Sequence, residues 1–387
     1  MKQKGKATQA IHGRRDRSFR SGAYPIYQTT NFAVDKSDDY QSFISDEEEF
    51  YIYSRYRNPT VQNVAEKLAK LENGESALVF SSGMAAITST ILSFAQQGDT
   101  IAASSQLYGM TYRFLRDTSP KLGIKVMFLD EEGLYNVDSI CPNAKIVYFE
   151  TPINPTTRCI SIKKVEESAK EINAIVMVDN TFASPVNQNP LDFGVDIVLH
   201  SATKYIGGHS DVMAGAVVSS KKNIQKIHDS LKAFGGCINP IDAYFLDRSL
   251  KTLKVRIQNH NENGLQLANF FQSHAKVKSV LYPGIENSRS YEIASNQMKG
   301  FGGMLCIELE NLDAAKTFCD NLKVALNITS LGGIETLVSI PVLTSHIKMD
   351  DEELRKSGVT PGMVRISTGL EDIEDLISDF ENALALI

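Results

Sequence analysis

The chain has 387 residues, of which 42% are hydrophobic and 22% charged, and its formal net charge is −6. This length is large for a single hydrophobic core, so we expect an ordinary globular protein of two domains. The acidic balance argues against nucleic-acid and membrane partners, and no apolar stretch is long enough to span a bilayer.

The five cysteines contain no Cys-x-x-Cys pair, which predicts reduced thiols in a cytoplasmic protein. His200, His209 and Asp211 have no known metal-ligand spacing, so we expect polar loop groups there and no metal site. The N-terminus is basic but lacks the apolar segment of a secretory signal.

The turn residues, aromatics and acidic stretch within residues 1 to about 55 predict an irregular arm. Regular elements are expected to begin after it. Helical spacing over 61–71 stops at Asn73-Gly74, and a strand over 77–80 leads through Ser82-Gly83-Met84 into a helix over 85–95. Further strands are predicted at 100–103, 125–129, 145–149, 174–178, 196–199 and 214–218. Because helical or loop segments separate most of them, we expect an α/β domain with a mostly parallel sheet covered on both faces.

The pattern changes from about Ile241 onward. A long helical stretch over 244–271, broken by polar residues, precedes strands near 277–281 and 303–309. Helices near 312–321 and 373–386 enclose a strand over 366–370 and an irregular segment over 330–346. This predicts a smaller α+β domain. We therefore expect an arm over 1–55, a large domain over 56–250 and a C-terminal domain over 251–387.

Lys204 and Asp179 are the first candidate site residues. Lys204 follows the apolar run that ends at Leu199, and Asp179 ends the run 174–178. Ligands of open α/β sheets bind at the carboxyl ends of the strands. An amine and a carboxylate at such ends suit pyridoxal phosphate (PLP), because the lysine forms a Schiff base and the carboxylate keeps the pyridine nitrogen protonated. A lysine with no such neighbours is usually a solvated surface charge.

A phosphate site is expected where the turn at Gly83 and Met84 opens a helix, since free N–H groups and a positive dipole end lie there. The hydroxyls of Ser201 and Thr203, which flank Lys204, would donate to the same phosphate. Arg55 is a candidate cation for it, although a surface salt bridge is the alternative. Strand–glycine–helix turns are common and mostly structural, so this motif is weak alone.

Two further residues have candidate roles in binding. Tyr108, in the loop after a predicted strand, would stack on a flat cofactor and move protons, or would be a core aromatic. Arg365, placed at the start of an apolar strand, would capture a carboxylate with its two-pronged guanidinium, or would form a structural ion pair.

Together these motifs resemble the PLP-dependent enzymes of cysteine and methionine metabolism, which include cystathionine γ-synthase, cystathionine γ- and β-lyases, methionine γ-lyase and the O-acylhomoserine sulfhydrylases. The resemblance runs from Ala7 to the last helix, which leaves no room for a transit peptide. The residues that carry it are Tyr53-Ser54-Arg55, Asn58-Pro59-Thr60, Ser82-Gly83-Met84, Val178-Asp179-Asn180-Thr181, His200-Ser201-Ala202-Thr203-Lys204-Tyr205, Ser330-Leu331-Gly332 and Arg365–Asp372.

The resemblance implies the fold type I (aminotransferase-like) architecture, PLP as cofactor and an amino-acid substrate. It implies that Lys204 carries the cofactor and shuttles protons, and that Asp179 pairs with the ring nitrogen. Gly83, Met84, Ser201 and Thr203 would hold the phosphate, and Tyr108 would stack on the ring and act at the leaving group. Arg365, with Ser330 positioning its loop, would bind the substrate carboxylate, while Tyr53 and Arg55 would reach the phosphate of a neighbouring subunit in a homotetramer built from two dimers.

The substrate is suggested by two positions. Cystathionine-handling γ-enzymes of this family usually carry acidic residues where this chain has Ile52 and Thr329. An unpaired ammonium there would be costly, so methionine, homocysteine or an O-acylhomoserine fits better, with γ-elimination or γ-replacement as the reaction. Cystathionine γ-synthase or cystathionine γ-lyase remains the alternative. Methionine γ-lyases often have cysteine at the position of Met110 and Lys-Asp-Met where this chain has Lys232-Ala233-Phe234, and both departures leave the subtype open.

Overall fold

The computed structural model describes residues 4–40, 50–286, 288–347 and 350–387. Its larger sheet has seven strands in the order β1-β7-β6-β5-β4-β2-β3. The strands are β1 Ser76–Phe80, β2 Thr100–Ser104, β3 Lys125–Leu129, β4 Ala144–Glu150, β5 Ile175–Asp179, β6 Ile197–His200 and β7 Gly215–Ser219. The five strands from β6 to β3 are parallel, whereas β7 runs antiparallel to both β6 and β1. The prediction of a mostly parallel sheet is therefore confirmed.

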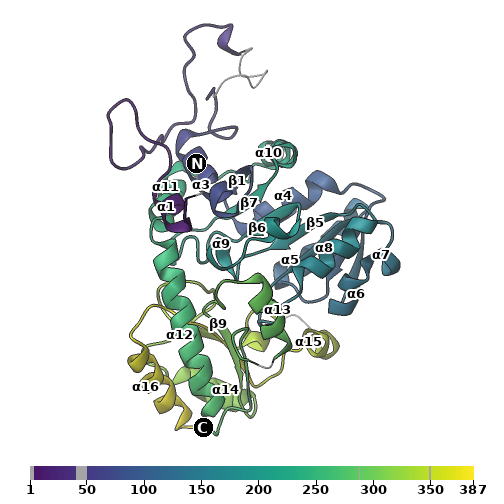
Figure 1. Cartoon of the computed structure of the whole chain (residues 1–387), viewed down its shortest axis with the longest axis vertical. Helices are drawn as coiled ribbons and strands as arrows, with labels where there is room; N and C mark the ends of the chain where they lie inside the picture. Colours follow the sequence, from purple (N-terminus) through teal and green to yellow (C-terminus); the bar gives the residue numbers. More distant parts are fainter. Residues whose placement is uncertain (1–3, 41–49, 287, 348–349) are drawn as a thin grey trace.

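Helices cover both faces of this sheet (Figure 1), because its central strands are apolar on both sides and must be shielded from water twice. They are α3 Pro59–Leu71, α4 Gly83–Phe94, α5 Gly109–Arg113, α6 Glu131–Tyr135, α7 Val137–Ile140, α8 Ile162–Glu171, α9 Ser184–Asn187, α10 Lys221–Phe234 and α11 Pro240–Leu250. Short π- or 3-10 turns span Phe114–Thr118, Ser119–Leu122 and Pro190–Phe193. The predicted strands lie within one or two residues of the observed ones.

The smaller sheet has five strands in the order β10-β11-β12-β9-β8. They are β8 Ser279–Leu281, β9 Met304–Glu308, β10 Leu326–Asn327, β11 Leu337–Ser339 and β12 Met363–Ser367. The accompanying helices are α12 Leu253–Ser273, α13 Arg289–Gln297, α14 Leu312–Asp320, α15 Asp351–Ser357 and α16 Ile373–Leu384, with a 3-10 turn over Pro341–Leu343. A buried aromatic cluster of Phe271, Phe318 and Phe380 joins three of these helices, and the last two rings stack with centroids 5.8 Å apart.

Three predictions about this region differ from the structure. The helix expected over 244–271 is two helices, because the guanidinium of Arg256 donates to the carbonyl of Ser249 at the end of α11 and so supports a break before α12. The strand expected over 366–370 begins at Met363, which places Arg365 in the middle of β12. The segment 330–346, expected to be irregular, contains β11.

The N-terminal segment also contains a helix, α1 Lys6–Ile11, which packs against α3. Between these two helices, much of the described chain over residues 12–40 loops away from the rest of the molecule (Figure 1). Part of the acidic stretch 35–49 lies outside the described residues. The expected boundary near residue 250 falls between α11 and α12, and the three-part division stays a prediction. No helix in the described part of the chain is long and apolar enough to cross a membrane.

Candidate active site

A cavity of about 590 Å³ lies where the carboxyl ends of the parallel strands face the smaller sheet. Nine of the eleven residues singled out in the sequence line it: Gly83, Met84, Tyr108, Asp179, Ser201, Thr203, Lys204, Ser330 and Arg365. They come from the end of β5, the start of α4, the turns after β2 and β6, the segment before β11, and from β12, so distant parts of the chain meet at one place. Tyr53 and Arg55 are not among the lining residues.

Asp179 and Glu150 are neighbours at the bottom of this cavity, because they are the last residues of β5 and β4 and lie in register. Asp179 Oδ1 accepts hydrogen bonds from the backbone N–H and the hydroxyl of Thr181, at 3.0 and 2.5 Å. Burial raises the pKa of the Asp179 carboxyl. A cation seated beside it would offset the cost of ionising the buried carboxyl.

Glu150 was missed in the sequence. Its two oxygens accept backbone N–H groups of Tyr108 and Asn154, each at 3.0 Å. Burial, followed by the nearby Asp179 carboxylate, raises the pKa of Glu150 to about 8. The sequence did carry a signal for it, since Glu150 directly follows a predicted buried strand, as Asp179 does.

Lys204 lies in the turn that follows β6, four residues beyond the strand end at His200. Its Nζ donates to Oγ of Ser330 at 2.7 Å. Burial, followed by the positive charge of Arg365, lowers the pKa of Lys204 to about 8. This lowered pKa makes the neutral, nucleophilic amine of Lys204 accessible near neutral pH.

Arg365 is buried in the cavity wall, and its guanidinium donates to Asn154 Oδ1 at 3.1 Å and to the carbonyl of Ser330 at 2.7 Å. Both acceptors are neutral. No ion pair is found for Arg365 within the described ranges, so the alternative of a structural ion pair receives no support. Ser330 has a φ of 92°, a conformation uncommon outside glycine, and it lets one residue serve both Lys204 and Arg365.

The turn at Gly83 has the form expected for anion binding. Ser82 caps α4 by accepting the N–H of Ala85, and Gly83 is the first helical residue. A Cβ on Gly83 would lie 2.9 Å from Cβ and Oγ of Ser201, so a side chain there would fill the space between the two turns. The Thr203 hydroxyl already donates to the carbonyl of Ala214 at 3.1 Å and must leave it to reach a phosphate.

Tyr108 stands at the mouth of the cavity and is 42% exposed, which rules out the reading as a core aromatic. Met110 is also exposed and lines a smaller neighbouring cavity with Arg113 and His346. His200 is not a loop residue as expected. It ends β6 and is buried, with Nε2 2.6 Å from Oε1 of Glu72.

Arg55 lies in a second cavity of about 460 Å³, away from Lys204. Its Nη1 donates to the carbonyl of Lys232 at 2.5 Å, and its guanidinium lies over the rings of Tyr53 and Tyr56, at 5.3 and 5.0 Å from their centroids. Within one chain, therefore, Tyr53 and Arg55 do not meet the other nine residues.

Comparison with known proteins agrees with this geometry. A sequence model of the Cys/Met metabolism PLP-dependent enzymes matches residues 7–385. The chain belongs to this family. It is 40% identical to an L-methionine γ-lyase of Fusobacterium nucleatum subsp. nucleatum over the full length of both chains, and 38% identical to a cystathionine γ-lyase of Bacillus subtilis, covering 98% of this chain and 99% of that one.

The fold agrees equally well with solved structures. A putative O-acetylhomoserine (thiol)-lyase from Campylobacter jejuni superposes with a TM-score of 0.95 at 30% identity, covering 99% of this chain and all of the other. That structure carries a pyridoxyl-lysine monophosphate. This protein is thus a PLP-dependent enzyme of the aminotransferase-like fold, and the predicted family, fold and cofactor are confirmed.

The residues of this cavity fit the cofactor. The turn at Gly83 leaves room for a phosphate, the buried carboxyl of Asp179 suits a protonated ring nitrogen, and Lys204 supplies an amine whose pKa is lowered to about 8. Asp179, Lys204 and Gly83 all line this one cavity, so a single cofactor molecule can reach all three.

Proposed function

We propose that this enzyme eliminates or replaces the group on Cγ of a short sulfur- or oxygen-bearing amino acid, with methionine, homocysteine and O-acylhomoserines as the candidate class. The observation that carries the proposal is the convergence of Lys204, Asp179 and Arg365 on one cavity. PLP, when bound, supplies an electron sink that makes protons on Cα and Cβ of the substrate removable.

On the cofactor side, Asp179 holds the ring nitrogen protonated, and Lys204 carries the cofactor covalently. The backbone at Gly83 and Met84, with the hydroxyls of Ser201 and Thr203, binds the phosphate. Tyr108 stacks on the ring from the cavity mouth, where its backbone N–H is fixed by Glu150.

On the substrate side, Arg365 binds the α-carboxylate. Its guanidinium is buried, and its partners among the described residues, Asn154 and the Ser330 carbonyl, are neutral, so an anion gains much by pairing with it. Ser330 places its hydroxyl beside the Lys204 amine, which would receive and return protons at the substrate. Tyr108 moves a proton at the leaving group.

The distal end of the substrate is expected to be short or uncharged. Glu150 and Asp179 are the only acidic side chains among the described lining residues, and both lie at the strand ends. Met213, Thr329 and Leu343 are among the neutral residues that line the same cavity. An L-methionine γ-lyase and a cystathionine γ-lyase are both among the similar proteins, so cystathionine γ-synthase or γ-lyase activity stays the alternative.

We also propose that a dimer is the minimum active unit. Tyr53 and Arg55 do not line their own chain's cavity, and a neighbouring subunit's cavity is their expected place, in a homotetramer of two dimers. The division into arm (1–55), cofactor domain (56–250) and C-terminal domain (251–387) belongs to the same proposal. All five cysteines are free thiols, which is typical of a cytoplasmic location.

The test is a substrate panel of methionine, homocysteine, cystathionine, O-acetylhomoserine and O-succinylhomoserine, each with and without a thiol. Ammonia and 2-oxobutanoate released from methionine would establish γ-elimination, and Lys204→Ala should abolish both turnover and the visible absorption of the bound cofactor. Turnover of cystathionine alone would overturn the substrate assignment. Amino-group transfer to an added 2-oxo acid, without ammonia release, would overturn the reaction class.

A further inference from the structure

A buried carboxylate lies behind the strand ends that carry the cofactor-binding residues. Glu72 follows α3 and is 0% exposed. Neither Glu72 nor its partners Asn180, Asn189 and His200 are among the described residues that line the cavity. Glu72 therefore contacts neither cofactor nor substrate, and any effect on them passes through its partners.

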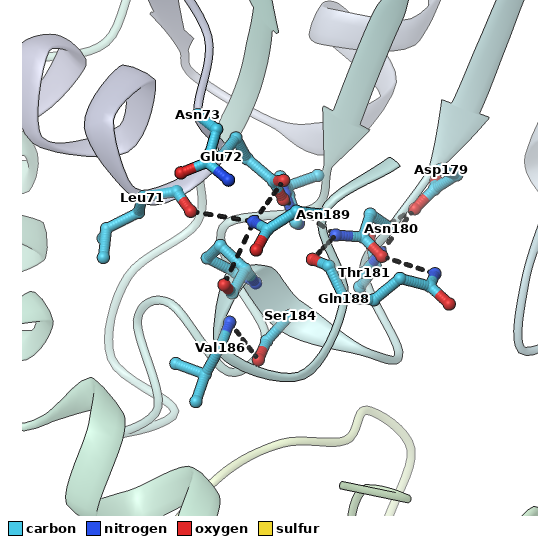
Figure 2. A network of polar contacts seen from close by, with 12 residues as sticks. Leu71, Glu72, Asn73, Asp179, Asn180, Thr181, Ser184, Val186, Gln188 and Asn189 are labelled. Atoms are coloured by element: carbon cyan, nitrogen blue, oxygen red, sulfur yellow. Dashed lines mark hydrogen bonds and ion pairs between the residues drawn. The ribbon is translucent and has the colours of Figure 1, made fainter. Parts of the chain in front are cut away.

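Three donors meet on this carboxylate. Asn180 Nδ2 donates to Oε1 at 2.7 Å, His200 Nε2 lies 2.6 Å from the same oxygen, and Asn189 Nδ2 donates to Oε2 at 3.1 Å. Figure 2 shows Glu72 between Asn180 and Asn189, with Asp179 and Thr181 beside them. A buried carboxylate is tolerated only when it is hydrogen-bonded in this way, and removing it leaves the donors without partners.

Two of the donors are sequence neighbours of cofactor-contacting residues. Asn180 follows Asp179 at the end of β5, and His200 precedes Ser201 at the end of β6. One oxygen of Glu72 thus holds both strand ends from the side opposite the cavity.

A second link joins the same strand ends on the cavity side. The Ser201 N–H donates to Thr181 Oγ1 at 2.8 Å, and that hydroxyl donates to Asp179 Oδ1 at 2.5 Å. Glu72 Oε1 contacts Asn180, next to Asp179, and His200, next to Ser201. Together with the Thr181 link, this contact fixes the distance between Asp179 and Ser201.

The network also reaches the neighbouring strand. Gln188 Nε2 donates to Asn180 Oδ1 and to the carbonyl of Thr151, both at 2.9 Å. Thr151 directly follows Glu150, the carboxyl that holds the Tyr108 loop. The ends of β4, β5 and β6 are in this way connected behind the cavity.

We propose that Glu72 is a positioning residue for this enzyme: through Asn180 and His200 it sets the separation of Asp179 from Ser201 and so the fit of the cofactor. The inference rests on the proposed roles of Asp179 and Ser201. Misplacement of reacting groups by about 1 Å costs about 100-fold in rate, so a small shift of either strand end is measurable.

The test compares Glu72→Gln with Asp379→Asn. Asp379 is a matched control, since it is also a buried carboxylate with three donors, the backbone N–H groups of Lys323, Val324 and Ala325, and it lies on α16, away from the cavity. The measurements are the Kd of the apoprotein for PLP, its unfolding temperature, and kcat and KM for the best substrate of the panel.

Both substitutions are expected to lower the unfolding temperature. Glu72→Gln alone should also weaken PLP binding about 10- to 100-fold and lower kcat by a similar factor with little change in KM. Glu72→Asp, which keeps the charge, should restore part of the PLP affinity. Unchanged PLP affinity and kcat in Glu72→Gln, measured well below its unfolding temperature, would overturn the proposal.

If Glu72→Gln does not fold, Asn180→Ala tests the same proposal. It removes the hydrogen bond between position 180, next to Asp179, and Glu72, while His200 keeps its contact with Glu72. Weaker PLP binding in Asn180→Ala supports the proposal, and unchanged binding refutes it. The PLP measurement needs no substrate. An enzyme inactive on the whole panel, whose Glu72 variant still binds PLP weakly, would refute the proposed reaction and leave the positioning role standing.

Discussion

Lys204 and Ser330 lie 126 positions apart in the chain, yet the lysine amine donates to the serine hydroxyl at 2.7 Å. The carbonyl of the same serine accepts a hydrogen bond from Arg365, the proposed carboxylate ligand. One residue in an uncommon backbone conformation therefore contacts both the group that is proposed to move protons and the group that is proposed to bind substrate. This relationship leads to the first two predictions.

Replacing the Ser330 hydroxyl should affect catalysis more than binding. Ser330→Ala keeps the carbonyl that Arg365 uses but removes the partner of Lys204, so we expect kcat to fall about tenfold with KM nearly unchanged, the effect of one hydrogen bond of about 1.5 kcal/mol. Ser330→Gly relaxes the φ of 92° and loosens the carbonyl, so KM should rise as well. Steady-state kinetics of both variants test this, and equal KM effects in the two would contradict it.

The rate at which the apoprotein takes up PLP should depend on pH through Lys204. A neutral amine attacks an aldehyde and an ammonium does not, so the rate should rise with pH and level off above the lysine pKa of about 8. Burial is the larger cause of this lowered pKa and the charge of Arg365 the second. In Arg365→Met the midpoint should move upward but stay below the ordinary value of 10.5. A wild-type midpoint near 10.5 would show that the site does not tune this amine.

Glu150 should make the apoprotein less stable as pH rises. Its pKa is raised from 4.5 to about 8 in the folded protein, so the folded state holds this proton more tightly than the unfolded chain does. The resulting stabilisation is complete below about pH 4.5 and is lost as pH rises to about 8. The unfolding temperature of the wild type should therefore fall more steeply across this range than that of Glu150→Gln. The pKa of Asp179 is also raised, but Asp179 is present in both proteins and affects them equally. If the unfolding temperature changed with pH in the same way in both proteins, the raised pKa of Glu150 would be contradicted.

The proposed contribution of Arg55 to a neighbouring site predicts complementation between two inactive chains. Arg55→Ala and Lys204→Ala should each lack activity or nearly so. In a hybrid pair, the intact Lys204 of one chain meets the intact Arg55 of the other, so one working site per pair should form. Co-expressed chains with different tags allow the hybrid to be isolated and assayed. A hybrid no more active than its parents would place Arg55 outside the neighbouring site.

The neutral residues Ile52 and Thr329, which we propose face the distal group of the substrate, predict a substrate switch. Ile52→Asp combined with Thr329→Glu should give cystathionine turnover, because the distal ammonium then finds anionic partners. Thr329 lines the cavity of its own chain, whereas Ile52 sits beside Tyr53 on the arm and depends on the subunit arrangement. Comparing kcat/KM for cystathionine and methionine before and after the change tests the idea. An unchanged kcat/KM for cystathionine would show that these two positions do not recognise the distal group of the substrate.

Local sequence identified much of this site because its residues sit beside strong signals. Asp179 ends an apolar strand, Gly83 opens a helix behind a serine cap, and Lys204 follows another strand. Parallel pairing of β5 and β6 brings Asp179 and the Lys204 turn to one edge, and β1 runs in the same direction because it is antiparallel to β7 as β6 is. Glu150 carried the same signal at the end of β4 and was overlooked. The boundary between α11 and α12 was not located, because the side chain of Arg256 in the second helix supports it by donating to the carbonyl of Ser249 in the last turn of the first.

The sequence by itself determined the family, the α/β architecture and PLP as the cofactor, since these depend on periodic apolar strands and on short motifs whose members are close along the chain. Only the tertiary structure decided that Ser330 joins Lys204 to Arg365, that Glu72 reaches the ends of two strands from behind, and that Arg55 lies away from its own chain's cavity. The contacts of Lys204 with Ser330 and of Glu72 with Asn180 and His200 join residues more than a hundred positions apart. Their geometry depends on how whole helices and sheets pack, and no local pattern encodes that packing.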